Sequence, residues 1–163
     1  MTQDEVKELF EYREVGLYWK EDRYSNKVKG CLAGYLDNRM YRKVHVNRKT
    51  YAMHKLVYLY HHGYMPEIVD HINGCPCDNR IENLRDVSQS ANAQNRSHKS
   101  RKSNTGIRNV TYNSKRNKYV VRVCCNYESK FIGEFTTLEE AEIAAKEARK
   151  KYHEGYTEQR ETT

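Results

Sequence analysis

Four polar residues of one short segment have the types that phosphodiester hydrolysis requires: Asp70, His71, Asn83 and Asn92. Hydrolysis needs an activated water molecule and a group that stabilises charge on the phosphate and on the leaving oxygen. Histidine suits the first task because its pKa lies near neutral pH. A carboxylate and an amide oxygen suit the second, because a divalent ion such as Mg²⁺ prefers hard oxygen ligands.

The segment around these residues predicts the order strand, loop, strand, helix. Residues 68–72 and 81–87 are the extended pieces, and Ser88 can cap a helix that carries Asn92 in its first turn. A helix N-terminus favours an anionic phosphate. The same composition also fits a surface turn rich in Asp, Asn and His, and the residue types alone leave that alternative open.

Neighbouring residues of a strand point to opposite faces, which constrains Asp70 and His71. The two side chains can serve one site only if the strand ends or twists there, or if a metal ion lies at its edge.

The whole pattern resembles the HNH endonucleases, in particular the free-standing and intron-encoded homing endonucleases of phages. The residues that carry the resemblance are Val69-Asp70-His71-Ile72-Asn73-Gly74, then residues 78–85, then Asn92 and Asn95. The upstream run at 53–57 is similar to the His-Arg-Leu-Val run of that family, with Lys55 in place of Arg. The loop Cys75-Pro76-Cys77 departs from it, since Lys, Thr or Asn are more usual there.

The resemblance implies a ββα-metal fold with DNA as the substrate and Mg²⁺ or Mn²⁺ as the cofactor. It makes His71 the general base, Asp70 and Asn92 the metal ligands, and Asn83 a brace that holds the loop and orients His71. It also implies a phage protein that works in the cytoplasm of a bacterial host.

Residues 104–153 resemble the ethylene-response-factor type of DNA-binding domain, which recurs at the C-terminus of phage HNH enzymes. The matching pieces are residues 104–110, 118–123, 132–135 and 137–141, with Tyr119 where that family usually has Trp. The resemblance implies a three-stranded sheet in the major groove with a helix behind it. Alternation within 118–123 agrees with it, because odd positions would face the helix and even positions would face outward. The candidate DNA contacts are Arg108, Lys115, Arg116, Lys118 and Arg122.

The net charge of +7 is concentrated in the middle of the chain. Ten basic residues and one acidic residue lie within 93–130, whereas residues 1–92 are almost balanced and residues 131–163 are acidic. A basic block indicates a polyanionic partner, most often a nucleic acid. The alternative is a solvated linker.

Composition excludes several classes of protein. Apolar residues make up 37% of the chain and mean hydropathy is −1.03, so one large core is not expected. No apolar run approaches the ~20 residues of a membrane span, and the first residues lack a signal-peptide profile, so we expect neither a membrane protein nor a secreted precursor. The odd number of cysteines, five, fits a reducing compartment, and the Cys75–Cys77 spacing predicts no structural zinc.

The predicted fold class is α+β, with short antiparallel strands before the ββα-metal unit. Domains are expected at 1–96 (nuclease) and 105–158 (three-stranded sheet plus helix), joined by a basic linker at 97–104. The remaining expected elements are helices at 2–11 and 53–62, a hairpin of 33–36 with 41–46, strands near 107–112, 119–125 and 130–133, and a helix that begins after Thr137.

These features predict a metal-dependent endonuclease that cuts duplex DNA at a specific site. The sequence holds one Asp-His…Asn…Asn set, which favours a monomer that nicks one strand. The alternatives are a DNA-binding regulator that does not cleave and, more distantly, an RNA-binding module.

Overall fold

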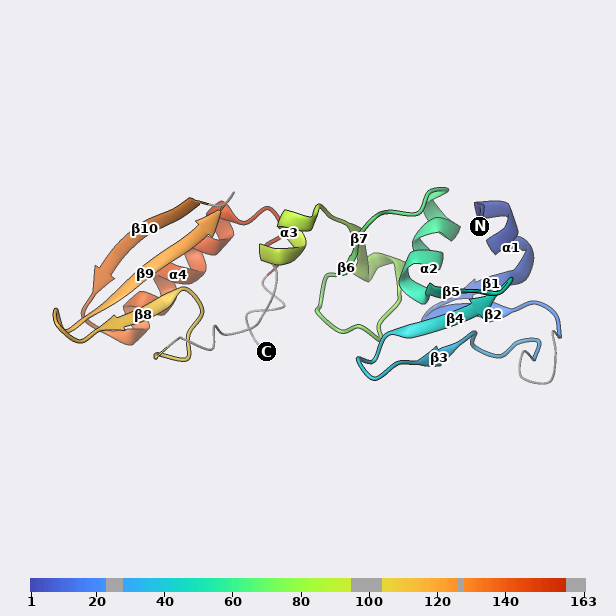
Figure 1. The fold of residues 1–163 in the computed structure, drawn as a ribbon, viewed down its shortest axis with the longest axis horizontal. Helices are drawn as coiled ribbons and strands as arrows, with labels where there is room; N and C mark the ends of the chain where they lie inside the picture. The colour runs from blue at the N-terminus through green and yellow to red at the C-terminus, as the bar shows by residue number, and fades with distance from the viewer. Residues whose placement is uncertain (23–27, 95–103, 126–127, 158–163) are drawn as a thin grey trace. The chain divides into compact units, whose positions relative to one another are not determined.

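The computed structural model describes residues 1–22, 28–94, 104–125 and 128–157, in two compact units at Met1–Val87 and Ser88–Thr163 (Figure 1). Helices and small antiparallel sheets are mixed in the chain, which is consistent with the predicted α+β class. The predicted linker at 97–104 lies outside the described residues except for Asn104, and so does Asn95. Among the described helices, none is both long and apolar enough to cross a membrane.

The first unit opens with helix α1 (Gln3–Leu9), which is capped by the predicted Thr2–Glu5 box. The helix was expected to reach residue 11, and that prediction is wrong. Phe10 begins strand β1 (Phe10–Arg13), which pairs with β2 (Gly16–Trp19). The rings of Phe10 and Trp19 lie 4.5 Å apart in the core, so burial of Phe10 overrides the helical pattern.

The predicted hairpin of the first unit is confirmed as strands β3 (Tyr35–Leu36) and β4 (Arg42–Val46). The sheet gains an unpredicted third strand, β5 (Lys49–Ala52), after a tight turn in which Asn47 and Arg48 have positive φ. Helix α2 (Met53–His62) follows and ends at Gly63 as predicted, because Gly63 adopts the left-handed conformation with φ of 79°. Its buried face packs in the core of the unit.

The segment with the four candidate residues begins with strand β6 (Val69–His71), which pairs with β7 (Leu84–Asp86). The expected extended piece at 81–87 is a strand only in its second half, because a 3₁₀ turn (Ile81–Asn83) precedes β7. Helix α3 (Gln89–Gln94) begins after Ser88, whose hydroxyl accepts a 3.1 Å hydrogen bond from the Ala91 N–H, as the sequence predicts. Contacts assign α3 to the second unit.

The second unit holds strands β8 (Val110–Asn113), β9 (Lys118–Cys125) and β10 (Glu128–Phe135) in the order β10-β9-β8, with helix α4 (Leu138–Tyr152) packed on the sheet. The predicted capping box, Thr137 with Glu140, is present. Strand β8 starts later than expected because Gly106 and Asn109 both have positive φ. Val121 and Val123 are fully buried, whereas Val120, expected to face outward, is also almost covered.

Candidate active site

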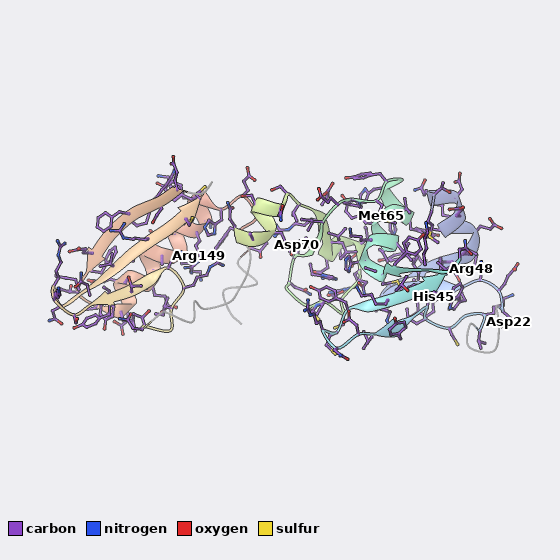
Figure 2. The ribbon with its side chains drawn as sticks, viewed as in Figure 1. Asp22, His45, Arg48, Met65, Asp70 and Arg149 are labelled. Atoms are coloured by element: carbon purple, nitrogen blue, oxygen red, sulfur yellow. The ribbon has the colours of Figure 1, made fainter. Side chains whose placement is uncertain are left out.

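His71 is the last residue of β6, so the strand ends there, which is one of the conditions under which Asp70 and His71 can serve one site. Both side chains are buried: Asp70 is 6% exposed and His71 is 4% exposed. Buried polar residues are rare unless they are paired or hydrogen-bonded. The interactions of these two residues therefore define the site (Figure 2, where Asp70 is labelled).

Asp70 forms an ion pair with Arg85, its partner across the β6–β7 ladder. The Arg85 guanidinium donates two hydrogen bonds to the same oxygen, Oδ2, at 2.8 Å from Nη2 and 3.1 Å from Nε. This ion pair explains how a carboxylate is kept in a largely buried strand, since a buried charge needs a partner.

The His71 ring contacts Asn79, a side chain that is 1% exposed. Asn79 Oδ1 lies 3.5 Å from His71 Nε2, and Asn79 Nδ2 donates to the Cys77 carbonyl at 3.1 Å. Because the amide nitrogen donates to a carbonyl, the amide oxygen must be the atom that faces the ring. The Nε2–H of His71 is then the donor, which makes Nδ1 the basic nitrogen of the neutral imidazole.

His54 on α2 and Tyr41 complete an aromatic cluster around His71. Ring centroids are 5.1 Å apart for His54–His71 and 5.9 Å for Tyr41–His71. His54 is 8% exposed, and its Nδ1 has no hydrogen-bond partner among the described residues. Burial lowers the pKa of His54 to about 3, with smaller contributions from His71 and from Lys43 and Lys55. His54 is therefore neutral at pH 7.

Asn83 fixes the loop between the two strands. Its side chain accepts from the Asn73 N–H at 3.0 Å, and its Nδ2 donates to Asn73 Oδ1 at 3.1 Å and to the Asp78 carbonyl at 2.8 Å. Asp78 is held in turn by Arg80, which donates to both carboxylate oxygens and lowers the pKa of Asp78 to about 2. The loop is therefore held at both ends by hydrogen bonds.

The fourth candidate, Asn92, lies on α3 in the second unit. Asp70 and His71 on β6 and Asn83 in the turn before β7 belong to the first unit. The positions of the two units relative to one another are not determined, so the structure does not place Asn92 beside them. Asp70 and Asn92 are hard oxygen donors, as Mg²⁺ or Mn²⁺ requires. The described residues hold no cluster of three His, Cys, Asp or Glu side chains suited to a metal ion. One carboxylate and one amide oxygen are few protein ligands, which suits an ion that keeps several water ligands.

The candidate DNA contacts of the second unit divide between different surfaces. Lys115, Arg116 and Arg122 line one groove on the face of the sheet opposite α4. Lys118 lines a separate depression beside α4, and the Arg108 guanidinium donates to the Gln94 carbonyl.

The groove is not purely basic. Arg116 forms a 2.7 Å ion pair with Glu134, and the Arg122 guanidinium lies 5.4 Å from the centre of the exposed Phe131 ring. The groove therefore presents cations held in place by a carboxylate and an aromatic ring.

Three residues of the site were not predicted to have roles: His54, Asn79 and Arg85. Asn79 and Arg85 lie within residues 78–85, which carry part of the HNH resemblance, so the sequence marked this segment but not the roles of the two residues. Only the pairing of β6 with β7 shows that Arg85 lies opposite Asp70. Only the folded loop between β6 and β7 shows that the Asn79 side chain reaches the His71 ring.

Comparison with known families agrees with this geometry. Residues 51–94 match the family model described as HNH endonuclease, and the matched segment runs from β5 through α3. It includes Asp70, His71, Asn83 and Asn92. No curated protein and no solved structure matches the chain. The segment that holds the candidate residues is therefore similar to HNH endonucleases.

Proposed function

We propose that this protein is a metal-dependent DNA endonuclease that hydrolyses phosphodiester bonds at a specific site. The observation that supports the proposal most is His71, a buried histidine that ends β6 beside a carboxylate within the segment that matches HNH endonucleases. A histidine held in one orientation in such a place suits general-base catalysis.

In this proposal Nδ1 of His71 accepts a proton from the attacking water, while the Nε2–H of the same ring points to Asn79. The water oxygen bonds to phosphorus, and the bond from phosphorus to the leaving oxygen breaks. The 3.5 Å distance from Nε2 to Asn79 is long for a hydrogen bond, as is common in catalytic groups before the substrate binds. Asn83 keeps its predicted role as the brace of the loop, through the three hydrogen bonds to Asn73 and Asp78.

Asp70 and Asn92 would hold the metal ion, Mg²⁺ or Mn²⁺. When bound, such an ion polarises the phosphoryl oxygen and neutralises charge on the leaving oxygen. Arg85 keeps the Asp70 carboxylate in place through Oδ2. The Ser88 hydroxyl caps α3 just before its first turn, so Asn92 lies near the positive end of its helix.

The second unit would bind DNA in the manner of the ethylene-response-factor domain that it resembles. Its groove with Lys115, Arg116 and Arg122 supports this role, because a sheet face with several cations suits phosphate contacts. Arg108 and Lys118 remain candidate contacts from other surfaces of the unit. Two DNA-binding parts on one chain suit a long target that a monomer reads.

The resemblance to phage homing endonucleases extends the proposal to a site-specific enzyme of a phage that acts in the bacterial cytoplasm. The single Asp-His…Asn…Asn set favours nicking of one strand.

A cleavage assay tests the proposal. Phage genomic DNA is incubated with the full chain and Mg²⁺, and a matched reaction receives excess chelator. Discrete cleavage that the chelator stops would support the endonuclease. Tight binding of duplex DNA with no cleavage in Mg²⁺ or Mn²⁺ would instead favour the DNA-binding regulator. Preference for single-stranded RNA in a competition experiment would contradict both.

A further inference from the structure

Cys75 and Cys77 form a close thiol pair in the loop between β6 and β7. Their sulfur atoms lie 2.8 Å apart, and both residues are free cysteines that reach the surface. The roles proposed for His71, Asp70 and Asn83 use neither thiol. This pair therefore needs an explanation of its own.

The two thiols differ in acidity in the way that thiol–disulfide exchange requires. The hydrogen bond between the two thiols lowers the pKa of Cys75, and the backbone N–H groups of Cys77 and Asp78 lower it further. The same contact with Cys75 raises the pKa of Cys77. Cys75 is therefore the better thiolate, and the thiolate is the reactive form of cysteine.

The loop backbone holds the two sulfurs together. The Cys75 N–H donates to Asn73 Oδ1 at 2.8 Å, and the Cys77 carbonyl accepts from Asn79 Nδ2 at 3.1 Å. A disulfide bond is ~2.05 Å long, so rotation of the side chains brings the sulfurs from contact to bonding distance.

We propose that Cys75 and Cys77 are a reversible dithiol–disulfide site that is oxidised by low-molecular-weight disulfides of the glutathione class. The proposal rests on the thiol pair alone and does not depend on nuclease activity.

The reaction consists of two exchanges. The Cys75 thiolate attacks one sulfur of oxidised glutathione, which forms a mixed disulfide and releases one glutathione thiolate. Cys77, as its thiolate, then attacks the Cys75 sulfur, which forms the internal bond and releases the second glutathione thiolate. The protons lost by the two protein thiols go to the two released thiolates. The protein dithiol is oxidised, and one glutathione disulfide is reduced to two thiols.

The chain contains a matched pair that lacks this arrangement. Cys124 and Cys125 are adjacent on β9, so their side chains point to opposite faces of the sheet. The Cys125 thiol instead donates to the Tyr152 carbonyl at 3.0 Å. Cys124 and Cys125 are thus closer in sequence than Cys75 and Cys77, but their side chains do not face each other.

The experiment uses two full-length variants. The first carries Cys31→Ser, Cys124→Ser and Cys125→Ser and keeps the Cys75–Cys77 pair. The second carries Cys75→Ser and Cys77→Ser and keeps the other cysteines. Each is incubated with oxidised glutathione without DNA, alkylated, and analysed by mass spectrometry before and after reduction.

In the first variant oxidation should leave neither Cys75 nor Cys77 open to alkylation, and the protein should carry no bound glutathione. Reduction should make both thiols open to alkylation again. The second should show free thiols or glutathione adducts and no internal disulfide. Two stable glutathione adducts on Cys75 and Cys77 would overturn the proposal, and so would two free thiols that are still alkylated after treatment with oxidised glutathione. If the first variant does not fold, peptide mapping of the oxidised wild-type chain gives the same decision, because the bond between Cys75 and Cys77 is found or is not found.

Discussion

The imidazole rings of His54 and His71 meet edge to face, with centroids 5.1 Å apart and ring planes at 82°. The two histidines come from different elements, α2 and β6, yet they share one buried cluster with Tyr41. His71 also contacts Asn79 through Nε2, so its ring packs against His54 and meets an amide oxygen. Together these two contacts restrict the orientation of the proposed base before any substrate is bound.

Acid should destabilise the first unit through His54. Its pKa is about 3 in the folded chain and near 6.5 when unfolded, so between these values the unfolded chain binds more protons. Stability is therefore present above pH 6.5 and is lost as pH falls toward 3, by at most about 1.4 kcal/mol per pH unit for one group. Between pH 7 and pH 5 the expected loss is about 2 kcal/mol.

Substitution of His54→Phe should remove that loss, since phenylalanine fills similar space and does not titrate. The measurement is urea unfolding at pH 7, 6 and 5, followed by fluorescence of Trp19, the single tryptophan and a buried residue of this unit. His45→Phe is the control, because His45 is exposed on β4. Equal pH dependence in wild type and His54→Phe would show that His54 does not titrate as described.

Loss of the proposed general base should slow cleavage without loss of binding. His71→Ala is expected to reduce the cleavage rate by about two to four orders of magnitude, the usual contribution of a general base. A gel-shift titration should give nearly the same affinity for duplex DNA. His45→Ala serves as the matched control and should retain wild-type rates. Full activity of His71→Ala would remove His71 from the mechanism.

The sequence predicted the parts of the site that depend on local pattern. Asp70, His71 and the Ser88 cap follow from residue type and spacing, and so do the capping boxes of α1 and α4. Contacts made by distant segments could not be predicted in this way. His54 reaches His71 only because α2 packs near β6, and the end of α1 at Leu9 follows from the burial of Phe10 against Trp19.

Strand β9 of the second unit also shows that contacts between distant segments could not be predicted from the sequence. Alternation in β9 correctly placed Val121 and Val123 in the core. It did not show that Val120 would also be nearly covered, since that depends on neighbouring strands. The five basic residues were predicted as one group of DNA contacts, and only the folded sheet separates the groove of Lys115, Arg116 and Arg122 from Arg108.

Removal of the proposed metal ligand should raise the Mg²⁺ concentration that cleavage requires. Asp70→Asn keeps the size of the side chain but removes the charge that pairs with Arg85 and would bind the ion. We expect activity to be abolished, or to be recovered only at higher Mg²⁺, and Asn92→Ala should behave alike. Asp86→Asn is the control, because Asp86 is a neighbouring carboxylate on β7 that accepts from Tyr64. An unchanged Mg²⁺ titration curve for Asp70→Asn would contradict its role as a ligand.

Neutralisation of the groove should weaken DNA binding and its dependence on salt. Each lost phosphate contact lowers the slope of log K against log salt by about 0.9. Arg122→Ala should therefore reduce affinity and reduce the slope by about that amount, as measured by fluorescence anisotropy at several salt concentrations. Lys146→Ala on the exposed side of α4 changes the charge equally and should leave the slope unchanged. Equal effects from the two variants would show that net charge, not the groove, sets the affinity.

The number of strands cut follows from the number of active sites on the DNA. The sequence contains one Asp-His…Asn…Asn set, so a monomer has one site, and cutting both strands would require a second copy or a reorientation on the DNA. A symmetric dimer would bring that second site and would read a palindromic target. We expect a monomer instead, because two different parts that the proposal assigns to DNA binding suit an asymmetric target. Supercoiled plasmid that bears the target should then become open circles at stoichiometric enzyme, while sedimentation with bound DNA should give one protein chain. Linear DNA as the first product, or two chains in the complex, would reject the nicking monomer.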